Sequence, residues 1–183
     1  TRMVAGIGVP QISAIMEVKK ALRKKKIKII SDGGIKFSGD IPKALAAGAD
    51  AIMMGSIFAG TDESPGKKFK SKGKIYKQYR GMGSIGAMSN GSANRYFQKN
   101  FKDKSKFVPE GVEGRVEYKG NVSKIIYQLQ GGLRSSMGYI GAKNLSEIKD
   151  KAKFIKITKA GFYESMVHSV EMTQKTINFK LWR

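Results

Sequence analysis

The sequence predicts an α/β fold made of parallel β/α units. Apolar residues at helical spacing alternate with short β-branched runs, and glycine-rich joints separate the two kinds of segment. Helices and strands that alternate with such short joints are typical of a parallel sheet with helical crossovers. Hydrophobic residues make up 40% of the 183-residue chain, which is enough to bury a core.

The first unit consists of a helix over residues 11–24 and a short strand. The apolar residues of the helix are close to helical spacing, and lysines gather at its C-terminal end, where positive charge suits the helix dipole. Ile27, Ile29 and Ile30 then form a β-branched run that stops at Ser31-Asp32-Gly33-Gly34. We therefore expect a strand over residues 27–30 that stops at Ser31.

The second unit repeats the pattern. A helix is expected from Asp40, as the N-cap with Pro42 in the first turn, to a C-terminal Gly48. An apolar strand over 51–54 follows and ends at Gly55-Ser56. Both polar glycine motifs thus follow the carboxyl ends of strands, where folds of this kind place their ligands.

The pattern breaks over residues 61–119. This segment is rich in Gly, Lys and Ser, contains Pro65 and Pro109, and has only short strand-like pieces at 69–75 and 114–118. So long a stretch without helical periodicity predicts a functional insertion or lid rather than a simple connector.

Regular periodicity returns after the insertion. The spacing predicts helices over 122–139 and 144–151 and a strand over 154–157, whereas 158–183 has no clear pattern. We divide the chain into β/α units (1–60), an insertion (61–119), and final helices with a C-terminal segment (120–183). Two β/α units cannot close a (β/α)8 barrel, which needs roughly 250 residues. We therefore interpret the chain as the C-terminal part of a larger protein.

Composition excludes several classes of site. The chain has no cysteine and one histidine, His168, which rules out a thiolate metal site and a two-histidine zinc motif. It shows no apolar run of about 20 residues and no signal-peptide pattern, which favours a cytoplasmic protein. The net charge of +21 suggests nucleic acid as an alternative partner. Because only seven of the 35 basic residues are arginine and the lysines are scattered, a solvated lysine surface is the preferred interpretation, and specific nucleic-acid binding is not expected.

Several short motifs could carry chemistry. Asp32-Gly33-Gly34 can direct a carboxylate at a diol while glycine amides approach a ligand, and Gly55-Ser56 could offer amides and a hydroxyl to phosphate. In the insertion, Tyr79-Arg80-Gly81-Met82-Gly83-Ser84 could wrap phosphate and cover a base. Arg95-Tyr96 and the two carboxylates of Glu110-Gly111-Val112-Glu113-Gly114 are further candidates. Each motif alone could equally be a turn or surface residues.

Taken in order, these motifs resemble one family. Together with Thr1-Arg2-Met3-Val4-Ala5-Gly6, Ala46-Ala47-Gly48-Ala49-Asp50, Glu63-Ser64-Pro65-Gly66 and Gly131-Gly132-Leu133-Arg134-Ser135, they resemble the C-terminal half of bacterial-type inosine-5′-monophosphate (IMP) dehydrogenase. The resemblance covers nearly the whole chain. The related guanosine monophosphate (GMP) reductase is the alternative, but its insertion lacks a counterpart of Arg95-Tyr96.

The resemblance implies a (β/α)8 TIM barrel with a mobile flap and finger insertion after the last barrel strand. It implies NAD-dependent oxidation of IMP to XMP through a covalent cysteine intermediate, followed by hydrolysis. The cysteine of the family lies just upstream of Thr1, so an N-terminal half of the enzyme is an expected partner. A homotetramer is also implied.

The resemblance also implies roles for individual residues. Asp32 would hold the ribose, and Gly34, Gly55, Ser56 and Tyr79 would surround the phosphate. Gly33 and Arg80 would be further substrate-binding residues. Gly81, Met82 and Gly83 would line the base, and Glu110 would meet the purine ring. Arg95, with Tyr96 beside it, would activate water, and a relay of Thr1 and Glu110 is the alternative. A potassium ion would bind backbone carbonyls of Glu164, Ser165 and Met166, although the family's usual Glu-Ser-His is here Glu-Ser-Met.

Overall fold

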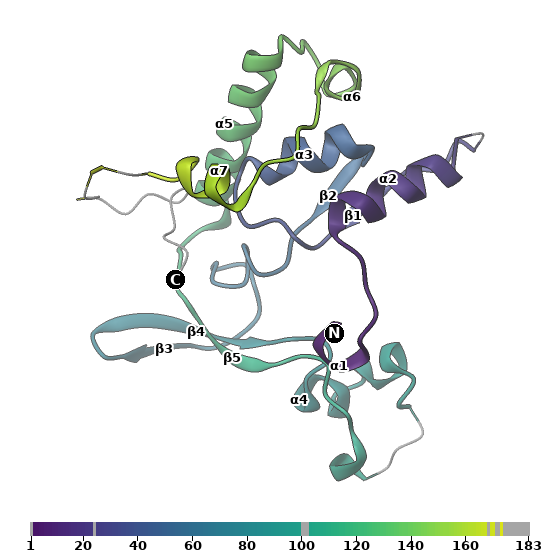
Figure 1. Cartoon of the computed structure of the whole chain (residues 1–183). Coiled ribbons are helices and arrows are strands. Elements are labelled where there is room, and N and C mark those ends of the chain that lie inside the picture. The colour runs from purple at the N-terminus through teal and green to yellow at the C-terminus, as the bar shows by residue number, and fades with distance from the viewer. Residues whose placement is uncertain (1, 24, 100–102, 168, 171–172, 174–183) are drawn as a thin grey trace. The chain divides into compact units, whose positions relative to one another are not determined.

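The computed structural model describes residues 2–23, 25–99, 103–167, 169–170 and 173 (Figure 1). The chain forms two compact units. One, the strand-turn unit, consists of Thr1–Pro10 and Met54–Lys124. The other, the β/α unit, consists of Gln11–Met53 and Ile125–Arg183. None of the described helices combines the length and the hydropathy needed to cross a bilayer.

The β/α unit confirms the predicted α/β class. Helix α2 (Gln11–Ala21) leads to strand β1 (Ile30–Asp32), and helix α3 (Asp40–Ala47) connects it to strand β2 (Ala51–Met53). The two strands pair in parallel, with Ile30 opposite Ala51 and Asp32 opposite Met53. A helical crossover between parallel neighbours is the β/α arrangement that the sequence predicts.

Three helices complete this unit. They are α5 (Val122–Ile140), whose first turn belongs to the other unit, α6 (Glu147–Lys151) and α7 (Lys159–Glu164). Helix α6 packs against α3, and Lys149 of α6 donates to Asp50 at 3.1 Å. The core consists of apolar side chains that are at least nine-tenths buried: Ile15, Ile29, Ile35, Ile41, Ala44, Leu45, Ala47, Ala49, Ile125, Leu129, Ala142 and Ile148.

Two predicted boundaries in the first half of the chain are wrong by a few residues. The strand predicted over residues 27–30 begins at Ile30, because Ile29 bonds outside the ladder: its carbonyl accepts from the amides of Asp50 and Ala51, at 2.8 and 3.1 Å. Asp40 is not the N-cap of α3, a position that Gly39 occupies. The Asp40 carboxylate instead accepts from the amides of Lys36 and Phe37, which precede the helix.

Two further expectations in the C-terminal part need correction. The helix expected over 144–151 begins only at Glu147, because the side-chain oxygen of Asn144 accepts from the Glu147 amide at 3.1 Å and ends the preceding loop. Residues 154–157 form no strand with any described part of the chain. Ile155 is 83% exposed, so this apolar run lacks the paired neighbour that a strand requires.

The strand-turn unit contains a three-stranded antiparallel sheet, visible as the long ribbon in Figure 1. Its strands are β3 (Lys68–Ser71), β4 (Lys74–Arg80) and β5 (Glu113–Glu117), in the order β3-β4-β5. The predicted single piece over 69–75 is a hairpin, because Lys72 and Gly73 turn the chain with φ of 48° and 76°. A left-handed backbone conformation is uncommon for lysine, so the sequence does not predict this turn.

Short helices fill the rest of this unit: α1 (Arg2–Ala5), α4 (Ile85–Ser89) and the 3₁₀ helices η1 (Ser92–Tyr96) and η2 (Lys104–Lys106). No helix was expected between 61 and 119. Helix α4 is too short to show a period, and groups at its first turn stabilise it. The Ser84 hydroxyl accepts from the Ala87 amide at 3.3 Å, and Glu113 of β5 accepts from the Gly86 amide at 2.7 Å.

The two ends of segment 61–119 lie side by side. Thr61 bridges to Gly120, the amide of Asp62 donates to the Gly120 carbonyl, and the amide of Lys119 donates to Gly60, both at 2.9 Å. A Cβ on Gly60 would overlap the carbonyl oxygen of Glu117, so glycine permits this close approach. The chain thus leaves and returns at one place.

Candidate functional site

The Asp32-Gly33-Gly34 motif lies at the end of β1, in the β/α unit. Gly33 and Gly34 have φ of 94° and 80°, which explains two consecutive glycines. The side-chain amide of Gln11 donates to the Ser31 hydroxyl at 3.1 Å and to the Asp32 carbonyl at 3.0 Å. This contact fixes the end of the strand, and Asp32 itself is exposed.

Gly55 and Ser56 begin a series of turns in the strand-turn unit, and both are exposed. The amide of Phe58 donates to the Gly55 carbonyl at 3.0 Å. The ammonium of Lys119 donates to the carbonyls of Ile57 at 2.6 Å and Ser56 at 3.4 Å. The carbonyls of Ser56 and Ile57 are therefore held by the Lys119 ammonium.

The loop after β4 packs against the turn before β5. Tyr79 and Arg80 are the last residues of β4 and pair with Gly114 and Glu113. Just beyond them, the Gly81 amide donates to the Val112 carbonyl at 2.9 Å. The Gly83 carbonyl accepts from the amides of Glu110 and Gly111, each at 3.0 Å. The structure therefore brings the predicted base-side residues together with Glu110, while Met82 between them stays half exposed.

Helix η1 adds the predicted Arg95-Tyr96 pair to the same loop. A Cβ on Gly83 would lie only 2.9 Å from Cζ of Tyr96, so the ring rests on the Gly83 backbone. The Ser92 hydroxyl donates to the Met82 carbonyl at 2.6 Å. Arg95 itself is exposed. An exposed guanidinium beside a phenol that packs on the loop forms a polar face to which water has access.

Other predicted residues do not belong to the unit that holds this cluster, or lie outside the described residues. Asp32, Gly33 and Gly34 belong to the β/α unit, and Thr1 lies outside the described residues, as does His168. Glu164, Ser165 and Met166 form the end of α7, where the amides of Ser165 and Met166 donate to Gly161 and Tyr163. Over the described ranges, no group of three His, Cys, Asp or Glu side chains could hold a metal ion.

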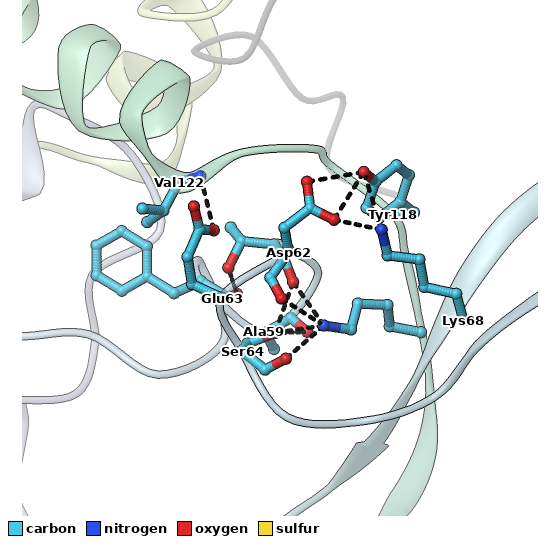
Figure 2. A network of polar contacts seen from close by, with 10 residues as sticks. Ala59, Asp62, Glu63, Ser64, Lys68, Tyr118 and Val122 are labelled. Carbon is cyan, nitrogen blue, oxygen red and sulfur yellow. Dashed lines mark hydrogen bonds and ion pairs between the residues drawn. The ribbon is translucent and has the colours of Figure 1, made fainter.

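Sequence reasoning missed a polar network at the base of the insertion, shown in Figure 2. The Tyr118 hydroxyl lies 2.9 Å from both carboxylate oxygens of Asp62, and Lys68 donates to the same carboxylate and to Tyr118. The hydrogen bond from Lys68, followed by that from Tyr118, lowers the pKa of Asp62. These partners are up to 56 residues apart, so no local pattern could reveal them.

Glu63 is a second missed residue. Its carboxylate accepts from the amide of Val122 at 2.9 Å, at the start of α5 (Figure 2). Asn121 caps the same helix, because its side-chain oxygen accepts from the Ser123 amide at 2.8 Å. The only signal in the sequence was the Glu63-Ser64-Pro65-Gly66 motif of the resemblance, which gives no partner.

Comparisons with known proteins identify the family. The family model of the IMP dehydrogenase / GMP reductase domain matches residues 1–168. The inosine-5'-monophosphate dehydrogenase of Aquifex aeolicus is 57% identical over 180 residues, which are 98% of this chain and 36% of that protein. That of Methanocaldococcus jannaschii is 54% identical, over 99% of this chain and 38% of that protein.

A solved structure gives the same result. The GMP reductase C318A of Trypanosoma brucei, in complex with guanosine 5'-monophosphate, superposes with a TM-score of 0.82 and 45% identity over 93% of this chain and 34% of that one. The chain belongs to the IMP dehydrogenase / GMP reductase family. It spans little more than a third of the length of these curated relatives.

Proposed function

We propose that this chain is the C-terminal part of an IMP dehydrogenase that oxidises IMP to XMP with NAD in guanine nucleotide synthesis. The observation that carries the proposal is the packing of Tyr96 and the Glu110-Gly111 turn on Gly83, which gathers the residues expected at the base. Identity of 53–57% with curated IMP dehydrogenases over nearly the whole chain supports it.

The proposed enzyme is a (β/α)8 TIM barrel with a flap and finger insertion. In this chain, residues 1–60 would supply barrel units, 61–119 the insertion, and 120–183 the last helices and C-terminal segment. Parallel pairing of β1 and β2 across α3, and the joined ends of the insertion, support this division. We also propose that this chain functions together with the N-terminal half of the same enzyme. The whole enzyme would be a homotetramer in the cytoplasm.

The proposed IMP site combines both polar glycine motifs. Asp32 would bind the ribose hydroxyls, while Gly34, Gly55, Ser56 and Tyr79 would surround the phosphate, with Gly33 and Arg80 as further substrate-binding residues. The exposed glycines leave backbone amides that an anion can reach, which supports the phosphate assignment. Gly81, Met82, Gly83 and Glu110 would then face the purine.

The chemistry divides between this chain and the rest of the protein. A cysteine thiolate supplied from outside this sequence would add to C2 of IMP. NAD, when bound, would accept the hydride from C2 as a two-electron oxidant and leave as NADH. Water would then add to C2 and the thiolate would depart, which yields XMP. Arg95, aided by Tyr96, would take the proton from that water, or Thr1 and Glu110 would relay it.

NAD itself would bind mainly through parts of the protein outside this sequence. Once NADH has left, the site of its nicotinamide ring would be empty, and Arg95 and Tyr96 would lie beside it. The exposure of Arg95 on η1, next to Tyr96, supports this assignment. The chain's own contribution would be to bind and orient the attacking water after NADH has left.

A potassium ion bound by backbone oxygens at the end of α7 is part of the proposal. Main-chain carbonyls are good ligands for this cation. Glu164, Ser165 and Met166 follow one another at this end, and the bonds of α7 to Ser165 and Met166 use the carbonyls of Gly161 and Tyr163. A side-chain change from His to Met at position 166 leaves such a backbone ligand in place.

GMP reductase is the second candidate, favoured by the 0.82 TM-score to the trypanosomal reductase. One assay separates the two: the whole protein is given IMP with NAD, and separately GMP with NADPH. We expect IMP-dependent formation of NADH and no GMP-dependent loss of NADPH. The reverse pattern would assign the protein to the reductases.

A further inference from the structure

Lys77 is a buried cation that the proposed chemistry does not use. It lies in the middle of β4 and is 2% exposed. Lysine is almost never buried to this degree unless its charge and its three N–H donors are satisfied. We therefore expect the groups around the Lys77 ammonium to accept its hydrogen bonds and to be held in place by it.

The Lys77 ammonium is surrounded by oxygens from one loop. It donates to the carbonyls of Thr61, at 2.6 Å, and of Ser64, and it lies 3.3 Å from the Ser64 hydroxyl and 3.5 Å from the Asp62 carbonyl. The Ser64 hydroxyl in turn donates to the carbonyls of Ala59 and Thr61, at 2.8 and 3.0 Å. The loop is thus wrapped around the ammonium.

A second lysine holds the beginning of the same segment. Lys119, two residues after β5, donates to the carbonyls of Ile57 and Ser56. We call Lys77 and Lys119 together the lysine clamp. The clamp attaches residues 56–64 to the three-stranded sheet at two points, by charge-assisted hydrogen bonds that are stronger than neutral ones.

The clamp connects two parts of the proposed phosphate site. Lys77 and Tyr79 are two residues apart on β4, so their side chains leave the same face of the strand. Residues 56–64 begin with Ser56, the proposed partner of the phosphate. Because the C=O and N–H of a trans peptide are antiparallel, the Ser56 carbonyl that faces Lys119 turns the Ile57 amide away from the clamp. The Phe58 and Asp62 amides already donate to Gly55 and Gly120. The Ile57 amide and the Ser56 side chain are therefore the groups that the clamp would direct at an anion.

We propose that Lys77 and Lys119 are positioning residues that set the Gly55-Ser56 loop against Tyr79 and so preorganise the site for the nucleotide 5′-phosphate. Neither ammonium touches the phosphate in this proposal. The inference rests on the proposed function, since it concerns the IMP site. Preorganised binding groups lose affinity when their support shifts by about 1 Å.

The test compares IMP with inosine, which lacks the phosphate, as ligands of the whole protein. Lys77→Met and Lys119→Met remove the ammonium groups but keep much of the side-chain volume. Lys74→Met is the matched control, because Lys74 lies on the same strand but is exposed and forms an ion pair with Glu117, at 3.3 Å. Dissociation constants are measured by calorimetry for IMP and by competition for inosine.

We expect each clamp variant to weaken IMP binding at least tenfold, to leave inosine binding within about twofold, and Lys74→Met to change neither. Equal weakening of IMP and inosine, or a lower melting temperature with unchanged IMP binding, would overturn the clamp proposal. If Lys77→Met does not fold, the half-buried Lys119 decides the question in the same way. If the unaltered protein does not bind IMP, the proposed function fails, and the clamp proposal fails with it.

Discussion

The ring of Tyr96 rests on the backbone of Gly83, with no room for a side chain between them. This contact joins helix η1 to the loop that follows β4, across 13 residues of sequence. The Gly83 carbonyl also accepts from the amides of Glu110 and Gly111, so three segments of the insertion meet at one glycine. In the proposed enzyme, the water-activating pair and the base-binding loop are therefore positioned by the same residue.

Replacing Gly83 should disturb both the position of the Tyr96 ring and the loop that follows β4. In Gly83→Ala the new Cβ would lie 2.9 Å from Cζ of Tyr96 and 3.1 Å from the Gly111 amide nitrogen, so the ring and the turn must move. We expect a loss of about 1–3 kcal/mol in unfolding free energy, typical of an overpacked site, with a raised KM for IMP. Gly114→Ala is the control, since its Cβ would meet no atom within 4 Å. Unchanged unfolding and KM in Gly83→Ala would contradict the packing.

Glu63 should stabilise the start of α5. Its carboxylate accepts from the Val122 amide at 2.9 Å, and a negative charge at a helix N-terminus is favourable. Glu63→Ala should reduce the unfolding free energy by about 1 kcal/mol, the usual effect of losing a cap. Glu63→Gln should retain part of this stabilisation, because the side-chain amide oxygen can still accept from the Val122 amide. Hydrogen exchange at Val122 measures the effect, and protection as high in Glu63→Ala as in the parent protein would refute it.

Asp50 should make stability depend on acid pH. The amide of Ile29 and then the ammonium of Lys149 lower the pKa of Asp50 below its ordinary value of 3.8. A carboxyl with a lowered folded pKa contributes stability that is complete above its unfolded pKa and disappears as the pH falls through the folded pKa. Asp50→Asn should therefore be less stable than the parent at pH near 7, with a difference that shrinks below about pH 4.

Denaturant unfolding at a series of pH values measures this dependence. Glu17→Gln removes the same charge from the exposed surface of α2 and serves as the control. If Asp50→Asn and the parent protein differed by the same free energy at neutral and at acid pH, the ion pair and the Ile29 contact would not be the source of the stability.

Arg95 should act only in hydrolysis. In the whole protein, Arg95→Ala should leave hydride transfer intact and slow the release of XMP, because its guanidinium is exposed beside the loop rather than built into it. Rapid mixing should then show a burst of NADH, close to one per active site, before slow turnover. Loss of the burst itself, with IMP and NAD still bound, would show that the assigned role is wrong.

Elements with a repeated pattern could be predicted from the sequence. Helices α2, α3 and α5 have apolar residues at helical spacing over two turns or more, and β2 lies within an apolar run that ends at Gly55. Strand β1 shares only Ile30 with the apolar run that predicted it. Helix α4 and the β3–β4 turn could not be predicted. The first depends on Glu113 from a distant strand, and the second places Lys72 in a conformation that lysine rarely adopts.

The candidate site was predictable where glycine is required by the backbone. Gly33 and Gly34 have positive φ, so their presence in the sequence already indicated a special turn. The lysine clamp was not predictable. Lys77 stands among 35 basic residues that composition assigns to a solvated surface, and only the fold shows that it is buried among carbonyls.

The most direct test of the proposed function follows the oxygen that reaches C2. The whole protein is given IMP and NAD in water enriched in ¹⁸O, and the product is analysed by mass spectrometry. We predict XMP that carries one ¹⁸O atom from solvent, formed in equal amount to NADH, because hydrolysis at C2 follows hydride transfer. Absence of labelled XMP, with IMP left unoxidised, would contradict the assignment of this chain to an IMP dehydrogenase.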